Sequence, residues 1–161
     1  MAGSTSKKII AVRFDREVVQ GFVNLQGYLH DTGVELITSS GALVTLPYSE
    51  VKALCFVLDF EPSVAPWKAH RAFSNRPKTE GLWIRLQFRD GDTLEGVMAN
   101  NLLIVEAQGF NLVPPDAGFQ TRVFVPRTAV TQAQVLGVVG SPLRRPSKPK
   151  PADKYQLKMF E

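Results

Sequence analysis

Apolar and polar residues alternate along several short segments of the chain. The alternation is clearest at Ile10, Val12 and Phe14, and again along residues 82–88. Such a pattern places one face of a β-strand against a core and the other face in water. Turn-forming residues separate further β-like segments, which are 34–38, 43–46 and 54–58 in the first half and 109–113, 122–125 and 134–139 in the second.

The order of these features repeats along the chain. Segments 11–23 and 85–97 align so that Phe14 matches Phe88 and Gly21 matches Gly96, with one residue fewer in the first turn. The later segments of each half follow in the same order. A duplication of a unit of about 55 residues explains this self-similarity.

Each unit has the features of a small barrel. Gly21 and Gly96 lie within the second predicted strand of each unit, where glycine marks a bend that lets a short sheet curl. Segments 47–51 and 126–130 each predict a single 3₁₀ turn before the fifth strand. The sequence therefore predicts an all-β fold of two tandem five-stranded small barrels related by internal duplication, with a disordered C-terminal tail.

The expected boundaries are 7–60 for the first barrel, 61–80 for a linker, 81–139 for the second barrel and 140–161 for the tail. The linker holds the one candidate helix, 67–73, because Pro66 suits a first helical position. A unit of about 55 residues buries a marginal core, so the units are expected to pack together or to form a homo-oligomer.

Composition narrows the function classes. The chain has 161 residues, a net charge of +4, one Cys and two His, which excludes an internal disulfide framework and disfavours a structural zinc site. The tail carries the whole charge excess, with six basic and two acidic residues, so a uniformly basic nucleic-acid-binding body is excluded. Apolar runs are too short for a signal peptide or a membrane span, and a cytoplasmic location is expected.

The residue pattern resembles an uncharacterised bacterial family, a domain of unknown function, over about residues 7–139. The resemblance rests on Arg13-Phe14, Gly21-Phe22, 47–54, 56–60, 85–91, 109–116 and 123–125. The first unit departs from the family pattern because Asp15-Arg16-Glu17 lacks the glycine found at Gly91. The hairpins also resemble those of Sm-like small barrels, which implies RNA binding or ring formation by analogy of fold.

No residue pattern predicts catalysis, a cofactor or a metal site. His30 and His70 have no paired nucleophile, and Cys55 lies in an apolar strand where core packing explains it. The linker residues Trp67, Lys68, His70 and Arg71 and the tail residues Arg144 and Arg145 are candidates for nucleic-acid contact. The alternative for the linker is that Trp67 and Phe73 anchor it to the barrels while its charges stay solvated.

The end of the tail has an apolar cluster behind a basic, proline-rich segment. Gln156-Leu157-Lys158-Met159-Phe160 resembles the peptide by which bacterial polymerases and repair proteins bind the DNA sliding clamp. That resemblance implies that Leu157, Met159 and Phe160 fill apolar pockets and that Gln156 makes a polar contact. Docking on another partner, or folding of the tail back onto the body as an added strand, are the alternatives.

Two functions follow from these features. The first is a non-enzymatic adaptor, in which tandem small barrels carry a C-terminal docking motif for a partner such as the sliding clamp. The second is an RNA- or DNA-binding protein that uses the barrels and the basic linker. An enzyme is the third and least favoured class.

Overall fold

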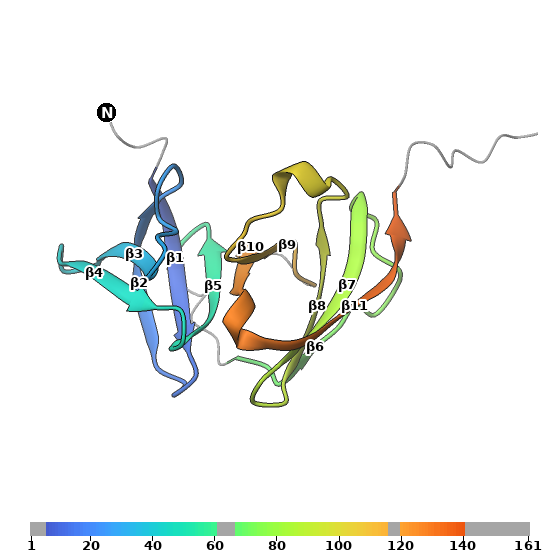
Figure 1. The fold of residues 1–161 in the computed structure, drawn as a ribbon, viewed down its shortest axis with the longest axis horizontal. Coiled ribbons are helices and arrows are strands. Elements are labelled where there is room, and N and C mark those ends of the chain that lie inside the picture. The colour runs from blue at the N-terminus through green and yellow to red at the C-terminus, as the bar shows by residue number, and fades with distance from the viewer. Residues whose placement is uncertain (1–5, 61–66, 116–119, 141–161) are drawn as a thin grey trace, which may run out of the picture.

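The computed structural model describes residues 6–60, 67–115 and 120–140. These residues form β-strands in two sheets, with no α-helix among them, so the prediction of an all-β fold is confirmed (Figure 1). The elements are β1 (Ser6–Arg13), β2 (Val18–Asn24), β3 (Gly33–Thr38), β4 (Leu43–Pro47), β5 (Val51–Val57), β6 (His70–Arg71), β7 (Gly81–Phe88), β8 (Thr93–Met98), η1 (Leu102–Ile104), β9 (Gly109–Leu112), β10 (Gln120–Pro126), η2 (Arg127–Ala129) and β11 (Val130–Val139). No helix in the described ranges has the length and hydrophobicity needed to cross a membrane.

The larger sheet joins the two halves of the chain. Its strand order is β4-β3-β2-β1-β5-β10-β9, whereas the smaller sheet has the order β11-β7-β8-β6. At the junction, β5 and β10 run antiparallel, and Cys55 lies opposite Val123. Figure 1 shows these two strands side by side near the centre of the molecule. The last strand of the first half is therefore extended by strands from the second half.

The expectation of two separate closed barrels is not confirmed. Within the described residues neither sheet closes on itself, and β9 and β10 extend the first sheet instead of completing a second one. An isolated antiparallel bridge between Val97 and Val113 links β8 to the region after β9. Pairing of β10 with β5 therefore spreads the second half over both sheets.

The candidate helix at 67–73 is wrong. His70 and Arg71 form β6 instead, which runs parallel to β8 with His70 opposite Thr93. The amide of Thr93 also donates a hydrogen bond of 2.9 Å to the carbonyl of Ala69. The backbone groups of this segment find partners on the edge of β8, and this pairing replaces the hydrogen bonds of a helix.

Two hydrophobic cores lie on opposite faces of the shared sheet. Along β1, Ile10 and Val12 belong to one core, whereas Ile9 and Ala11 belong to the other. Every residue of β5 is buried. The first core also includes residues of β7 and β8 from the smaller sheet. Side chains on the two faces of β1 and β5 thus contribute to both cores.

The hairpin turns of the two halves have the same geometry but align differently from the sequence prediction. The amides of Arg13 and Phe88 each donate to the carbonyl four residues later, so Phe88 corresponds to Arg13 and not to Phe14. The two turns therefore have equal length. Arg16, with φ of 70°, occupies the place of Gly91, with φ of 94°. Arg16 adopts the left-handed conformation that glycine adopts without steric cost.

A buried lysine ties β5 to the second hairpin turn. The Lys52 ammonium donates hydrogen bonds to Asp90, at 2.6 Å, and to Asp92. It also lies 5.1–5.9 Å from the ring centres of Phe14, Trp67 and Phe88. Burial alone would raise the pKa of Asp90, but the hydrogen bond and charge of Lys52, with backbone amides, lower this pKa below its ordinary value.

Candidate interaction surfaces

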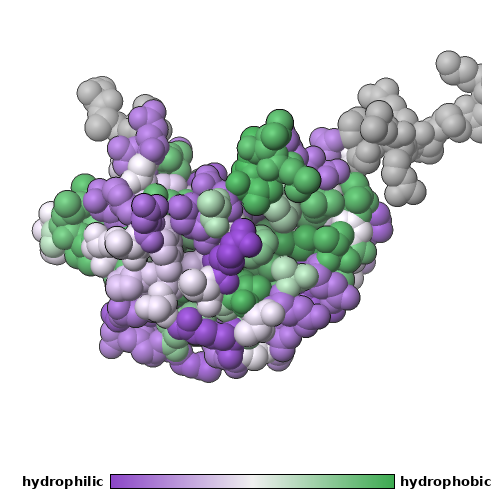
Figure 2. All heavy atoms as spheres, viewed as in Figure 1, coloured by the Kyte–Doolittle hydropathy of each residue, from purple (hydrophilic) through white to green (hydrophobic). Residues whose placement is uncertain are grey.

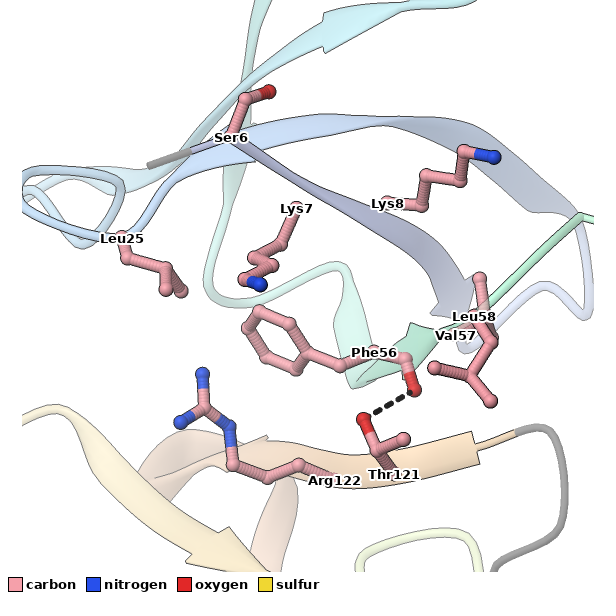
Figure 3. Close-up of a pocket in the computed structure, with 9 residues that line it drawn as sticks. All are labelled: Ser6, Lys7, Lys8, Leu25, Phe56, Val57, Leu58, Thr121 and Arg122. Atoms are coloured by element: carbon pink, nitrogen blue, oxygen red, sulfur yellow. Dashed lines mark hydrogen bonds between the residues drawn. The ribbon is translucent and has the colours of Figure 1, made fainter. Parts of the chain in front are cut away.

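A groove lies where β1, β5 and β10 meet. It has a volume of about 560 Å³, and we call it the seam groove; its lining residues are Ser6, Lys7, Lys8, Leu25, Phe56, Val57, Leu58, Thr121 and Arg122. The floor is held by pairing of β5 with β10, where Thr121 Oγ1 donates to the Phe56 carbonyl at 3.4 Å. Figure 3 shows Lys7 and Arg122 reaching toward the Phe56 ring from different strands.

The seam groove has a positive rim. Lys7, Lys8 and Arg122 line it, and no carboxylate does. The Arg122 guanidinium lies 4.2 Å from the Phe56 ring centre, and its buried Nε has no hydrogen-bond partner among the described residues. Lys8 is partly neutralised by Asp59 at 3.6 Å. Lys7 and Arg122 are therefore the cations best placed to meet an anionic group.

A second candidate surface is apolar and projects from the body. Leu102, Leu103, Ile104 and Val105 are consecutive, and between 36% and 95% of each is exposed; we call them the apolar knob. Figure 2 shows a hydrophobic protrusion at the position of η1. Four adjacent exposed apolar side chains differ from the isolated ones that are normal on protein surfaces, and such patches mark interaction sites.

The knob keeps its shape through a local cap. Asn101 precedes η1, and its side-chain oxygen accepts a hydrogen bond of 3.0 Å from the Leu103 amide. The corresponding loop of the first half turns inward instead: Tyr28 is buried, with edge contacts to Phe56 and Phe124. The first-half loop thus buries its aromatic side chain, although Leu25 in the same loop is 37% exposed.

Sequence reasoning missed both surfaces. The seam groove combines β1 with β10, which lie more than a hundred residues apart, so no local pattern indicates it. The knob does carry a signal, because an unbroken apolar run between Asn101 and Glu106 departs from strand alternation. A run of this kind is typical of a buried segment, so the sequence marks these residues but does not predict their exposure.

The linker residues lie close to the first core. Trp67 packs edge-on against Phe88 with ring centres 5.7 Å apart, and Phe73 does the same with Trp83 at 6.4 Å. These contacts support the alternative in which Trp67 and Phe73 anchor the linker. The Arg71 guanidinium donates to Gln120 and to the Pro115 carbonyl, which further ties the segment to the body.

The other candidate residues are more dispersed. Lys68 and His70 are exposed, and His70 Nδ1 lies 3.0 Å from Thr93 Oγ1. The structure therefore brings Trp67 and Arg71 together, at 5.7 Å, but places them against the body. The remaining candidates, Arg144, Arg145, Gln156, Leu157, Met159 and Phe160, lie outside the described residues.

Two chemical features bear on the search for a reactive site. Cys55 is buried, and burial raises the pKa of its thiol to about 12, in agreement with a core role. Within the described residues, no group of three or more His, Cys, Asp or Glu side chains is placed to hold a metal ion.

Comparison with known proteins places the chain in a family. No curated protein and no solved structure matches it. Residues 5–137 match the model of the family of unknown function DUF6982. Because this match covers most of the chain, including both halves and the linker, the protein belongs to the DUF6982 family.

Proposed function

We propose that the protein is a non-enzymatic interaction protein that binds a protein partner. The observation that carries this proposal is the apolar knob, in which four consecutive apolar residues are exposed on a capped turn. Full burial of a Leu or Ile side chain contributes about 1.5–3 kcal/mol, so the knob offers a large gain to a partner with an apolar pocket. The cap lowers the cost of ordering the turn on binding.

The C-terminal motif supplies a second proposed contact. Leu157, Met159 and Phe160 would enter apolar pockets of the DNA sliding clamp, with Gln156 as the polar anchor. In this proposal the proline-rich composition of residues 141–151 would give such a motif reach. In this proposal the folded body and the tail bind different surfaces, as an adaptor requires.

Binding to purified sliding clamp tests the proposed tail contact. Titration calorimetry with the full chain should give a Kd in about the micromolar range, and Met159→Ala with Phe160→Ala should abolish the heat. The matched control is Val18→Ala, because Val18 is an exposed apolar residue outside the knob, the seam groove and the tail. Absence of binding by the unaltered chain at high micromolar concentration rules out the clamp as the partner.

The knob needs its own test. Photo-crosslinking in cells that naturally produce the protein should yield adducts from a probe at Leu103, and Leu102→Ser should remove them. A probe at Val18, which is exposed and lies outside the seam groove, is the control. Equal adducts with and without Leu102→Ser would mean that the knob binds no partner.

The seam groove favours a second candidate function, binding of RNA or DNA. Lys7 and Arg122 line the groove from different strands, and such a pair of cations can bind a phosphate backbone. The proposed likeness to Sm-like barrels, and the basic residues Lys68, His70, Arg144 and Arg145, belong to this candidate. It ranks second because the residues before the tail are neutral in net charge.

Fluorescence anisotropy with single-stranded RNA and DNA tests this second candidate. Affinity should fall steeply with salt, and Lys7→Gln should reduce the salt slope by about one. Arg16→Gln is the control, because Arg16 is an exposed cation outside both the groove lining and the linker. Binding that is absent at low salt refutes the candidate.

A further inference from the structure

The junction between β5 and β10 is an interface between two equivalent halves of one chain. In its register, Phe56 lies opposite Arg122 and Leu54 lies opposite Phe124. Phe56, Leu54 and Phe124 are all almost completely buried. The pairing joins the fifth strand of the first half to the fourth strand of the second half.

Backbone pairing identifies the equivalent of β5 in the second half. Ile9 pairs with Gly21 and with Phe56, whereas Ile84 pairs with Gly96 and with Val135. β11 therefore corresponds to β5, and Val135 corresponds to Phe56.

The equivalent of β10 in the first half follows in the same way. Gly33 pairs with Pro47 in β4, and Gly109 pairs with Pro126 in β10. Pro47 therefore corresponds to Pro126, and Leu43 and Arg122, each four residues before its proline, correspond to each other. The internal pair of Phe56 with Arg122 therefore has Val135 and Leu43 as its counterpart.

Both counterpart strands lie at open edges. Among the described strands, β4 pairs with β3 alone and β11 pairs with β7 alone. Leu43 is 66% exposed and Val135 is 61% exposed, although Phe56 is 4% exposed. Segments 43–47 and 130–139 contain no charged residue. Monomeric proteins protect sheet edges with charges, prolines or bulges, and these two edges have Pro47 and the register shifts of β11 but no charged residue.

We propose that β4 of one copy of this chain pairs antiparallel with β11 of a second copy. Leu43 then lies opposite Val135 of the neighbour, and the contact repeats the geometry of the internal junction. The occupant is a second copy because the chain already contains this pairing between equivalent strands. The two edges differ, so the contact is head-to-tail and produces a ring if the rotation closes or a filament if it does not.

Sedimentation velocity of the full chain tests this assembly. At about 100 µM, where an interface of micromolar Kd is saturated, the unaltered chain should exceed the 17.8 kDa protomer mass. Leu43→Lys and Val135→Lys should each lower the association constant about tenfold or more, because each places an unpaired charge in the contact. Val18→Lys is the control and leaves assembly unchanged, since Val18 is 44% exposed and lies on β2, which is flanked by β3 and β1.

Mixing the two edge variants distinguishes this contact from others. Leu43→Lys keeps β11 intact and Val135→Lys keeps β4 intact, so their mixture has one competent junction and should give a dimer of twice the protomer mass. A symmetric interface gives no such recovery. Unfolding midpoints equal to that of the unaltered chain show that the variants remain folded. A monomeric unaltered chain at about 100 µM, or a mixture without dimer, overturns the proposal. Neither result bears on the partner binding proposed for the knob or the tail.

Discussion

Replacement of Lys52 by Met tests how the two halves are held together. The substitution keeps an unbranched side chain but removes the ammonium that donates to Asp90 and Asp92. Side-chain exposure is 5% for Lys52, 32% for Asp90 and 15% for Asp92. The two carboxylates therefore lose their partner where water replaces it only in part.

The expected loss of unfolding free energy is about 3 kcal/mol. Removal of one member of a buried ion pair costs about 3–5 kcal/mol, and the partial exposure of Asp90 places this case at the lower end. For a chain of this size, each kcal/mol lowers Tm by about 2–4 °C, so the expected decrease is about 6–12 °C.

Urea unfolding at neutral pH, followed by tryptophan fluorescence, measures this loss. The matched variant combines Lys52→Met with Asp90→Asn and Asp92→Asn, which removes the orphaned charges and should recover about half of the stability. Because the pKa of Asp90 is lowered in the folded state, its stabilising contribution is present at neutral pH. That contribution is lost as the pH falls through the lowered pKa, and Lys52→Met should lack this acid-dependent part.

Two results would refute this reasoning. A cost below about 1 kcal/mol for Lys52→Met would place the ion pair among ordinary surface pairs. An unchanged acid dependence in the variant would show that Lys52 does not control the ionisation of Asp90. Either result would mean that the pairing of β5 with β10 and apolar packing join the halves without a contribution from the Lys52 ion pair.

Because Arg16 occupies the place of Gly91 in the equivalent hairpin turn, Arg16→Gly should raise the unfolding free energy by about 0.5 kcal/mol. Relief of the left-handed backbone of Arg16 exceeds the entropy cost of glycine. Gly91→Arg should lower it by about 1 kcal/mol, and urea midpoints that move in the opposite directions would contradict the equivalence. For Cys55, burial and a pKa of about 12 predict that a thiol reagent at mildly alkaline pH labels the folded protein no faster than it unfolds. Rapid labelling under native conditions would show that the core opens locally.

Local sequence pattern was sufficient to predict most strands. Alternation in β1 and β7 and the hairpin turn at Gly91 depend on neighbouring residues, so a single segment contains the information. The alignment of Phe14 with Phe88 failed by one residue because Arg16 takes a backbone conformation that the sequence assigns to glycine.

The local sequence pattern could not predict the pairing of strands that lie far apart in the chain. On the side away from β1, β5 pairs with β10, which lies more than sixty residues later in the chain. Because of this pairing, the second half is divided between two sheets. One clue is present in the sequence: residues 53–58 form an apolar run without alternation, which is typical of a strand buried on both faces. The seam groove depends on the same pairing, so it became visible only with the fold.

The burial of β5 has a consequence for synthesis of the chain. When residues 1–60 have left the ribosome, β1 to β5 can pair with one another, but β10 has not yet been translated. During that interval the outer side of β5 offers an unpaired β-edge of Val51–Val57 with a single charge, Lys52, which is the composition of an aggregation-prone segment. Nascent chains therefore depend on prompt translation of residues 120–126, and the first half expressed alone should aggregate.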